Sequence, residues 1–179
     1  MKKVSAMVLI GGALLSFNAS AEEARGYFGV GYHLGLYDED QISDFTPTGL
    51  KFKIGKYLNK SVAVEANFVF GVEEDRQEIL GFDFDLGIKN SLSLFVKGDI
   101  DINDSALFYG LLGFSKGKLE FDVPDVGVSG ADSDSGLSYG FGIEVGVGSD
   151  LYLSGEYVLY MSKDDYDYSA FNFGMSVLF

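Results

Sequence analysis

Hydrophobic residues alternate with polar residues or glycine along most of this chain, a pattern typical of β-strands that have one apolar face. The last segment is the clearest case. Its apolar face carries Phe171, Phe173, Met175, Val177 and Phe179, and its other face carries Asn172, Gly174, Ser176 and Leu178. Seven earlier segments repeat the pattern. We therefore predict eight strands, at about 28–36, 49–55, 62–71, 82–100, 106–115, 137–147, 151–161 and 171–179.

Residue parity, meaning whether a position in a strand has an odd or an even number, assigns most side chains to one of the two faces. In the fourth segment Ile88 shares the apolar face with Leu92, whereas Lys89 shares the polar face, and in the seventh segment Met161 is apolar-facing. The fifth segment is apolar on both sides from Leu107 to Leu112, so its two faces stay unassigned.

Short turns alternate with longer polar segments between these strands. The short turns are at 59–60, 102–104 and 148–150, and the longer segments, expected to be loops, are at 38–47, 73–81, 117–135 and 163–168. This alternation is typical of outer-membrane barrels, which have short periplasmic turns and long external loops. The pattern predicts an all-β fold, an eight-stranded antiparallel up-and-down transmembrane β-barrel whose apolar face meets lipid.

A soluble barrel of the lipocalin kind is the alternative, in which the apolar face would point inward around a ligand. The glycines argue against it, because Gly29, Gly31, Gly140 and Gly142 share the face of the charged residues. Small and charged side chains suit the narrow interior of eight strands, while bulky ones have room outside. The transmembrane barrel is therefore favoured.

The N-terminal residues have the composition of a cleaved signal peptide, predicted at 1–21. Lys2 and Lys3 precede an apolar run from Val4 to Phe17, and Ala19-Ser20-Ala21 is a small-residue cleavage site. The barrel domain is then 22–179, exported to the outer membrane. It holds 11 basic and 27 acidic residues, a formal charge of −16, which argues against a nucleic-acid partner.

Seven charged residues share the polar face and are expected to line the lumen: Lys51, Lys53, Glu65, Lys97, Asp99, Glu144 and Glu156. They could form an ion path or a plug of paired charges. Buried charges are tolerated when they are paired, and eight-stranded barrels are usually filled by their own side chains. We expect the plug, with the three lysines paired to Glu65, Glu144 and Glu156.

The remaining candidate chemistry is sparse. His33, the single histidine, is on the predicted inner face, but the sequence identifies no serine beside it that could serve as a nucleophile. Asp132 and Asp134 begin a short acidic run that fails the EF-hand pattern, with Leu137 at the sixth position and Ile143 at the twelfth. We predict no catalytic residue, no dedicated metal site and no cofactor. Loose Ca²⁺ or Mg²⁺ bridging from the acidic loops to lipopolysaccharide stays open.

Two parts of the chain resemble small outer-membrane barrels. Residues 102–113 (INDSALFYGLLG) resemble a turn and strand of the OmpX/Ail type, and 139–144 (YGFGIE) with 151–157 (LYLSGEY) is similar to the next hairpin of that group and of OmpA-like barrel domains. The terminal Phe179 matches the assembly signal of such proteins, which implies that the outer-membrane assembly machinery reads Phe171, Phe173 and Phe179. The acidic loops match no segment of the family.

The resemblance implies the fold and location more than the activity. The expected partners are outer-membrane lipids, lipopolysaccharide, the assembly machinery and an extracellular ligand of the acidic loops, and a monomer is expected. A structural or adhesin-like surface role follows by analogy of fold alone. A lipid A-modifying enzyme and a narrow small-solute pore are the alternatives.

Overall fold

The computed structural model describes residues 25–39, 42–79, 82–163 and 166–179. The predicted signal peptide lies outside these residues. The described chain forms β1 (Gly26–Glu39), β2 (Ile42–Phe45), β3 (Thr48–Tyr57), β4 (Val62–Glu73), β5 (Asp75–Ile79), β6 (Phe82–Asn103), β7 (Ala106–Val123), the 3-10 turn η1 (Pro124–Val126), β8 (Val128–Gly146), β9 (Leu151–Ser162) and β10 (Tyr166–Leu178). No helix within these residues is both long and apolar enough to cross a membrane.

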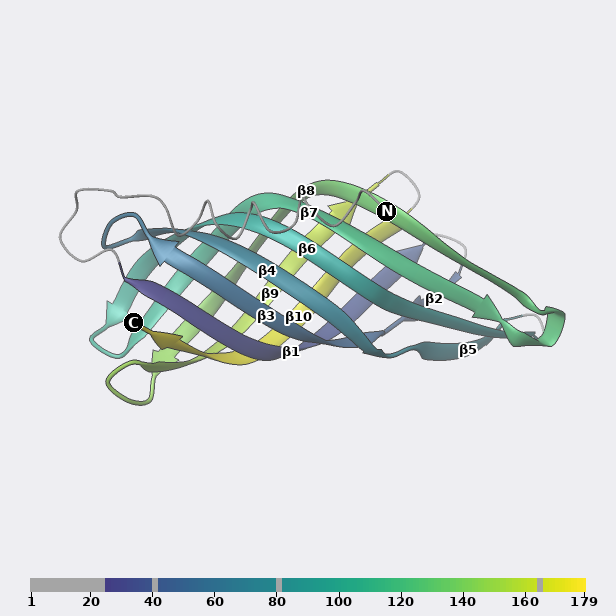
Figure 1. Cartoon of the computed structure of the whole chain (residues 1–179), viewed down its shortest axis with the longest axis horizontal. Coiled ribbons are helices and arrows are strands. Elements are labelled where there is room, and N and C mark those ends of the chain that lie inside the picture. The colour runs from purple at the N-terminus through teal and green to yellow at the C-terminus, as the bar shows by residue number, and fades with distance from the viewer. Residues whose placement is uncertain (1–24, 40–41, 80–81, 164–165) are drawn as a thin grey trace, which may run out of the picture.

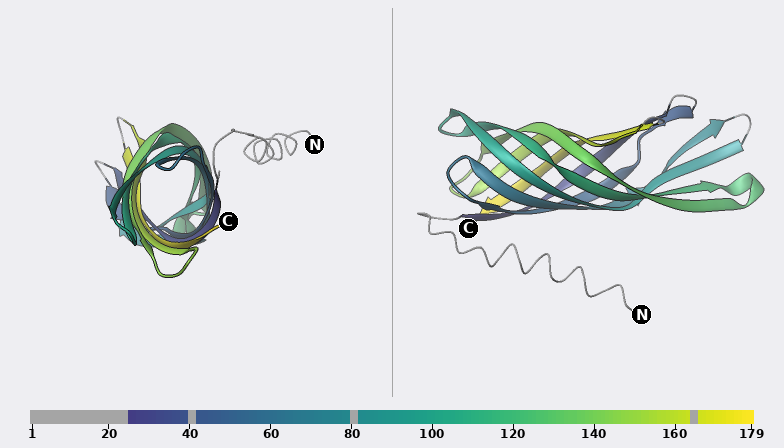
Figure 2. Two further views of the ribbon diagram at one scale, coloured as in Figure 1. Left: turned by 90° about the vertical axis from the view of Figure 1, so that its left-hand side faces the viewer. Right: turned by 90° about the horizontal axis from the view of Figure 1, so that it is seen from above.

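Eight of the strands close into a barrel. Neighbours pair antiparallel in the order β1, β3, β4, β6, β7, β8, β9, β10, and β10 pairs back to β1 from Tyr27↔Leu178 to Glu39↔Tyr166. The ring is visible along the barrel axis in the left panel of Figure 2. The short strands β2 and β5 pair only with β1 and β6. The predicted eight-stranded antiparallel barrel is confirmed.

The two ends of the barrel differ, and we call them the short-turn end and the long-strand end. Turns at 58–61, 104–105 and 147–150 join strands at the short-turn end, close to the three predicted short turns. The C-terminus lies there too, since Gly26 and Phe179 exchange two backbone hydrogen bonds of 2.9 and 2.8 Å. At the long-strand end β5 to β8 project past the rest of the barrel (Figure 1).

The prediction of a polar loop at 117–135 is wrong, because most of this segment is strand. β7 and β8 stay paired from Lys116↔Ser135 to Val123↔Val128, and only η1 and Gly127, with a φ of 66°, turn the chain. The hairpin projects past the rest of the barrel (Figure 1), and its backbone groups are satisfied by the ladder although its composition is polar.

The apolar face points outward, as the parity predicts. Phe28, Phe141 and Phe173 are 48%, 54% and 58% exposed on the outer wall. β7, whose faces the sequence leaves unassigned, turns Leu112 outward and buries Tyr109. An exposed wall of large apolar side chains suits lipid, not water.

Two β-bulges reverse the parity near the long-strand end, so the outward placement predicted for Ile88 and Met161 is wrong. One bulge follows Ile88 in β6, and the other adds Tyr160 to β9 opposite the step from Tyr168 to Ser169. An extra residue on one strand moves the side chains on the far side of the bulge to the other face of the sheet. Ile88 and Met161 are consequently 4% and 1% exposed inside, whereas Lys89 lies on the outer surface.

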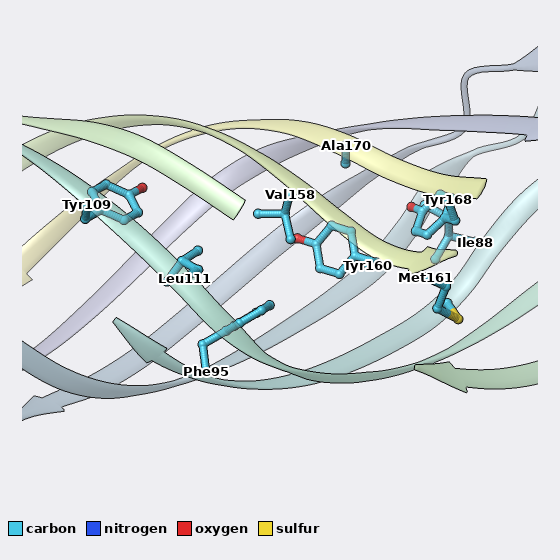
Figure 3. Packing of buried hydrophobic residues seen from close by; sticks show 9 residues of the cluster. All are labelled: Ile88, Phe95, Tyr109, Leu111, Val158, Tyr160, Met161, Tyr168 and Ala170. Carbon is cyan, nitrogen blue, oxygen red and sulfur yellow. The ribbon is translucent and has the colours of Figure 1, made fainter. Parts of the chain in front are cut away.

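The interior is thereby layered along the axis. An apolar and tyrosine-rich cluster runs along the lumen toward the long-strand end. It consists of Ile88, Phe95, Tyr109, Leu111, Val158, Tyr160, Met161, Tyr168 and Ala170 (Figure 3). A layer of charged residues lies nearer the short-turn end, and it carries most of the predicted site.

Candidate functional site

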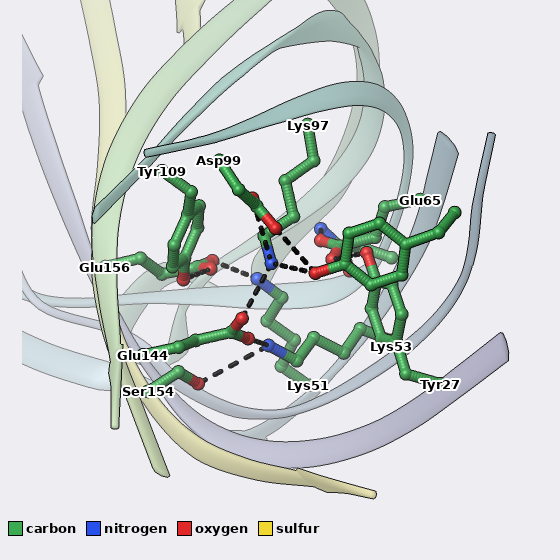
Figure 4. A network of polar contacts seen from close by, with 12 residues as sticks. Tyr27, Lys51, Lys53, Glu65, Lys97, Asp99, Tyr109, Glu144, Ser154 and Glu156 are labelled. Atoms are coloured by element: carbon green, nitrogen blue, oxygen red, sulfur yellow. Dashed lines mark hydrogen bonds and ion pairs between the residues drawn. The ribbon is translucent and has the colours of Figure 1, made fainter. Parts of the chain in front are cut away.

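The seven predicted lumen charges all point into the barrel, from five different strands. β3 carries Lys51 and Lys53, β4 carries Glu65, β6 carries Lys97 and Asp99, β8 carries Glu144, and β9 carries Glu156. Every one of these side chains is at most 6% exposed. The barrel therefore brings together charges that are up to 105 positions apart in the chain (Figure 4).

Two glutamates bind the three lysines. Lys51 donates to Glu156 Oε1, and the hydroxyl of Tyr109 donates to the other oxygen at 2.7 Å. Glu144 is shared, because Lys53 Nζ lies 2.9 Å from one of its oxygens and Lys97 Nζ lies 2.6 Å from the other. Each glutamate thus uses both oxygens, which is what a buried carboxylate requires.

Lys97 occupies a cage of tyrosines. Its ammonium lies 4.5, 5.4 and 5.7 Å from the ring centroids of Tyr109, Tyr27 and Tyr57. It also lies 3.3 Å from Asp99 and from the Tyr57 hydroxyl, while that hydroxyl donates to Asp99 at 2.6 Å. Cation–π contacts are favourable within about 6 Å and strengthen when water is excluded. The cage therefore stabilises a charge that has almost no contact with solvent.

Glu65 forms no ion pair with Lys51, Lys53 or Lys97, although the sequence analysis expects one. It accepts hydrogen bonds from the Tyr27 hydroxyl at 2.6 Å and from Asn67 Nδ2 at 3.0 Å. Hydrogen bonds to a carboxylate are roughly twice as strong as neutral ones. Two neutral donors hold this carboxylate in place of a lysine.

The tyrosines were missed by the sequence analysis, although parity places two of them. Tyr27 shares the parity of Gly29, and Tyr57 that of Lys53, on the inner face. Glycines give their rings room. A Cβ on Gly55 would lie 2.2 Å from Tyr27, and one on Gly142 would lie 2.5 Å from Tyr109.

Little space remains around Lys51, Lys53 and Glu156, whereas Asp99 and Tyr57 line a cavity of about 340 Å³ at the short-turn end. A cavity of about 10 Å³ lies beside Lys51, Lys53 and Glu156, which is about enough for one water molecule. The charged side chains and their tyrosines thus fill the cross-section at the level of Lys51, Lys53 and Glu156.

His33 lies next to the charged layer, on its side toward the long-strand end, and is buried inside the barrel. Its Nδ1 is 2.7 Å from Asn172 Oδ1 and its Nε2 is 2.5 Å from the Tyr168 hydroxyl. Neither partner is a serine. The buried serines Ser115 and Ser138 instead bond to each other at 2.6 Å. Within the described residues, the histidine–serine pair that the sequence analysis looks for is therefore not formed at His33.

The three aromatic residues of the expected assembly signal lie on the outer wall. Phe171, Phe173 and Phe179 are 43%, 58% and 72% exposed. The position of Phe179 at the closing seam beside Gly26 leaves its ring accessible at the short-turn end. The recognition of these rings during assembly remains a prediction.

Most of the acidic residues fall in four segments of the sequence. The segments 37–47, 73–89, 116–135 and 163–168 hold 18 acidic and five basic residues. Within the described residues no group of three or more His, Asp or Glu side chains is arranged to hold a metal ion. The Ser135 backbone N–H, the Tyr166 hydroxyl and Lys163 lower the pKa of Asp134, so this carboxylate is charged at neutral pH.

Comparison with known proteins gives a family. The outer membrane protein beta-barrel domain family matches residues 6–179, whereas no curated protein matches. Similar solved structures include Ail, the attachment invasion locus protein of Yersinia pestis, with 22% identity and a TM-score of 0.64 over 88% of this chain and all of Ail. Neisserial surface protein A has 13% identity and a TM-score of 0.66 over 87% of this chain and 99% of that one. OprG from Pseudomonas aeruginosa has 10% identity and a TM-score of 0.59, covering 88% of this chain and 97% of that one.

These likenesses in structure show the fold, and the family match gives the location. The outward apolar wall, the closed ring and the short turns agree with both. This chain belongs to the outer membrane protein beta-barrel domain family and is an eight-stranded barrel of the outer membrane.

Proposed function

We propose that this protein is a closed, non-enzymatic barrel that acts at the cell surface, in an adhesin-like role, through its long-strand end. The observation that carries the proposal is the contrast between the two parts of the molecule. Paired charges and tyrosines fill the lumen, while β5 to β8 project from it as continuous, hydrogen-bonded sheet. In this class the short turns are periplasmic, so the projection faces the outside of the cell.

The filled lumen argues against a pore. Opening a path through the charged layer would separate Lys51 from Glu156 and both Lys53 and Lys97 from Glu144. Separating a buried ion pair leaves uncompensated charges, and the removal of one partner from such a pair costs about 3–5 kcal/mol. We expect no steady, water-filled conductance in planar bilayers. A large, stable conductance of the purified protein would exclude this part of the proposal.

The charge of the long-strand end indicates which partners it favours. The described residues of 37–47, 73–89, 116–135 and 163–168 include 15 acidic and five basic ones, a formal charge of −10, which is most of the charge of the predicted mature chain. Such a surface attracts basic protein surfaces or cations, and it repels polyanions. One structure of Ail contains a heparin analogue, sucrose octasulfate. A polysulfated ligand of that kind does not suit the acidic end of this chain.

Adhesion of bacteria displaying the protein tests the surface role. In one variant, residues 119–132 are replaced by a two-residue turn, which removes the tip of the β7–β8 hairpin but not the barrel. In the control, the 147–150 turn at the short-turn end is rebuilt with other turn residues. We expect adhesion to a surface coated with basic protein to be lost only in the first variant and to weaken with salt. Equal adhesion of all three strains would contradict the proposal.

A second proposed partner is the phosphate-bearing part of lipopolysaccharide, and a group of outward lysines favours it. Lys116 and Lys118 continue the outer face of β7 above Phe114, and Lys89 lies beside them on β6. Among the described residues, Lys89 forms an ion pair with Glu120, whereas Lys116 and Lys118 form none. Lysines at the edge of a lipid band attract anionic headgroups.

Thermal unfolding in nanodiscs, with and without lipopolysaccharide, tests this contact. Lipopolysaccharide should raise the Tm of the wild-type protein more than that of the variant Lys116→Gln, Lys118→Gln. Lys60→Gln, at the short-turn end, is the control for loss of a lysine far from this group. Equal Tm increases in all three proteins would show that these lysines do not bind it.

A further inference from the structure

The long-strand end contains a cavity that the proposed function does not yet use. It measures about 220 Å³ and lies inside the mouth of the barrel, above the bulges. Its walls come from six strands, and they include Tyr37 on β1, Leu119 and Phe121 on β7, Asp132 and Asp134 on β8, and Tyr166 on β10.

Most of this wall is apolar or aromatic. Tyr37 and Tyr166 stack with ring centroids 5.3 Å apart and an interplanar angle of 24°. Leu119 and Phe121 lie on the same face of β7, two positions apart. A cavity lined in this way favours a ligand with an apolar stem.

The two aspartates of the wall differ in their partners. Asp134 accepts from the Tyr166 hydroxyl at 2.8 Å and lies 3.2 Å from Lys163. Asp132 accepts only the Ser133 backbone N–H, at 2.8 Å, and forms no ion pair within the described part of the chain. It lies directly across from Leu119 in the β7–β8 register, so carboxylate and apolar wall adjoin.

We propose that this cavity binds the side chain of a lysine presented by an extracellular polypeptide. The four-carbon stem lies against Leu119 and the tyrosine pair, and the ammonium lies at Asp132. Lysine has this combination of an apolar stem and a compact charge. The formal charge of −10 on the described residues of the four acidic segments favours a cationic ligand and disfavours an anionic one. The inference rests on the proposed surface function, because it names the group that the acidic end recognises.

A titration of the mature protein in nanodiscs tests the site. The probes are a capped Gly-Gly-Lys-Gly-Gly peptide, the same peptide with norleucine in place of lysine, and n-butylamine. Binding is followed by amide chemical shifts of residues 119 and 132–135. We expect saturable binding of the lysine peptide and none of the norleucine peptide, which keeps the stem and lacks the charge.

Two asparagine variants separate the site from the general charge. Asp132→Asn removes the unpaired carboxylate of the cavity. Asp122→Asn removes the same charge from the outer face of the same hairpin, since Asp122 is next to the cavity-lining Phe121 on β7. Asp132→Asn should weaken binding of the lysine peptide roughly fivefold, as expected for an ion pair near the surface, and Asp122→Asn should leave it unchanged.

Three results would overturn the inference. They are no saturable binding of the lysine peptide, an equal loss in both variants, and binding of n-butylamine as tight as that of the peptide, which would indicate a small-amine site. The surface function can fail separately. If Asp132→Asn leaves adhesion of displaying cells intact while removal of 119–132 abolishes it, the surface function holds and the lysine site is wrong.

Discussion

Glu156 is the residue whose replacement tests the charged layer most directly. It is the ion-pair partner of Lys51, and it also accepts the hydroxyl of Tyr109 at 2.7 Å. The variant Glu156→Ala leaves an ammonium with a side chain only 4% exposed. Within the described residues, Lys51 Nζ and the Tyr109 hydroxyl then have no hydrogen-bond partner.

The expected loss follows from these contacts. Removing one member of a buried ion pair costs about 3–5 kcal/mol, because the remaining charge stays desolvated. The neighbouring cavity of about 10 Å³ grows when the glutamate side chain is removed, and water entering it would solvate Lys51 in part. We therefore expect the free energy of unfolding to fall by about 3 kcal/mol, the lower part of that range.

Urea unfolding from lipid vesicles measures this loss, followed by circular dichroism and tyrosine fluorescence, since the chain has 11 Tyr and no Trp. The control is Glu120→Ala, which breaks the pair with Lys89 on the outer surface, where the side chains are 34% and 48% exposed. An exposed pair is worth less than about 1 kcal/mol. The double variant Lys51→Met, Glu156→Leu should recover most of the lost stability, because no unpaired charge is left.

Two outcomes would refute the reasoning. If Glu156→Ala shifts the urea midpoint no more than Glu120→Ala does, Lys51 is hydrated and the layer is wet. If the double variant is as unstable as the single one, the loss comes from packing around Glu156 and not from the unpaired ammonium.

Three further predictions concern other parts of the barrel. Phe141→Arg on the lipid face should lower the free energy of unfolding by about 2–4 kcal/mol if it lies near the bilayer midplane, and unimpaired stability in vesicles would contradict the lipid-facing assignment. Deleting Phe179 removes two backbone hydrogen bonds to Gly26, worth about 0.5–1.5 kcal/mol each; refolding in detergent should suffer modestly and yield in cells severely, and equal losses would show ordinary packing. Because the pKa of Asp134 is lowered, its contribution to stability is complete at pH values above the usual pKa of 3.8 and is lost as the pH falls through its folded pKa. The chemical shift of the Ser135 amide should therefore titrate with a midpoint below pH 3.8. A midpoint at or above that value would contradict the prediction.

The sequence alone predicts the barrel and its lipid-facing wall. The alternation in the final strand places Phe171 and Phe173 outward, and glycines on the charged face favour a narrow interior. These predictions succeed because the two-residue period of a strand is local, so each side chain reveals its face without knowledge of the other strands. The inward direction of Lys51 and Glu156 follows in the same way.

Local alternation fails where a strand gains a residue. At the bulges after Ile88 and at Tyr160 the period is interrupted, so Ile88 and Met161 turn inward against the prediction. The polar composition of 117–135 likewise suggests a loop, although its backbone is paired strand, because the ladder hydrogen bonds do not depend on the polarity of the side chains.

The partners within the lumen were decided by the tertiary structure. Parity shows that Glu65, Glu144 and Glu156 point inward, but not that Glu65 is held by Tyr27 while Glu144 is shared by Lys53 and Lys97. The same holds for the cavity at Asp132, whose walls come from six strands. Such contacts depend on the stagger between strands that closure imposes. A residue's face is a local property of its strand, whereas its partner across the lumen depends on the register of the whole ring.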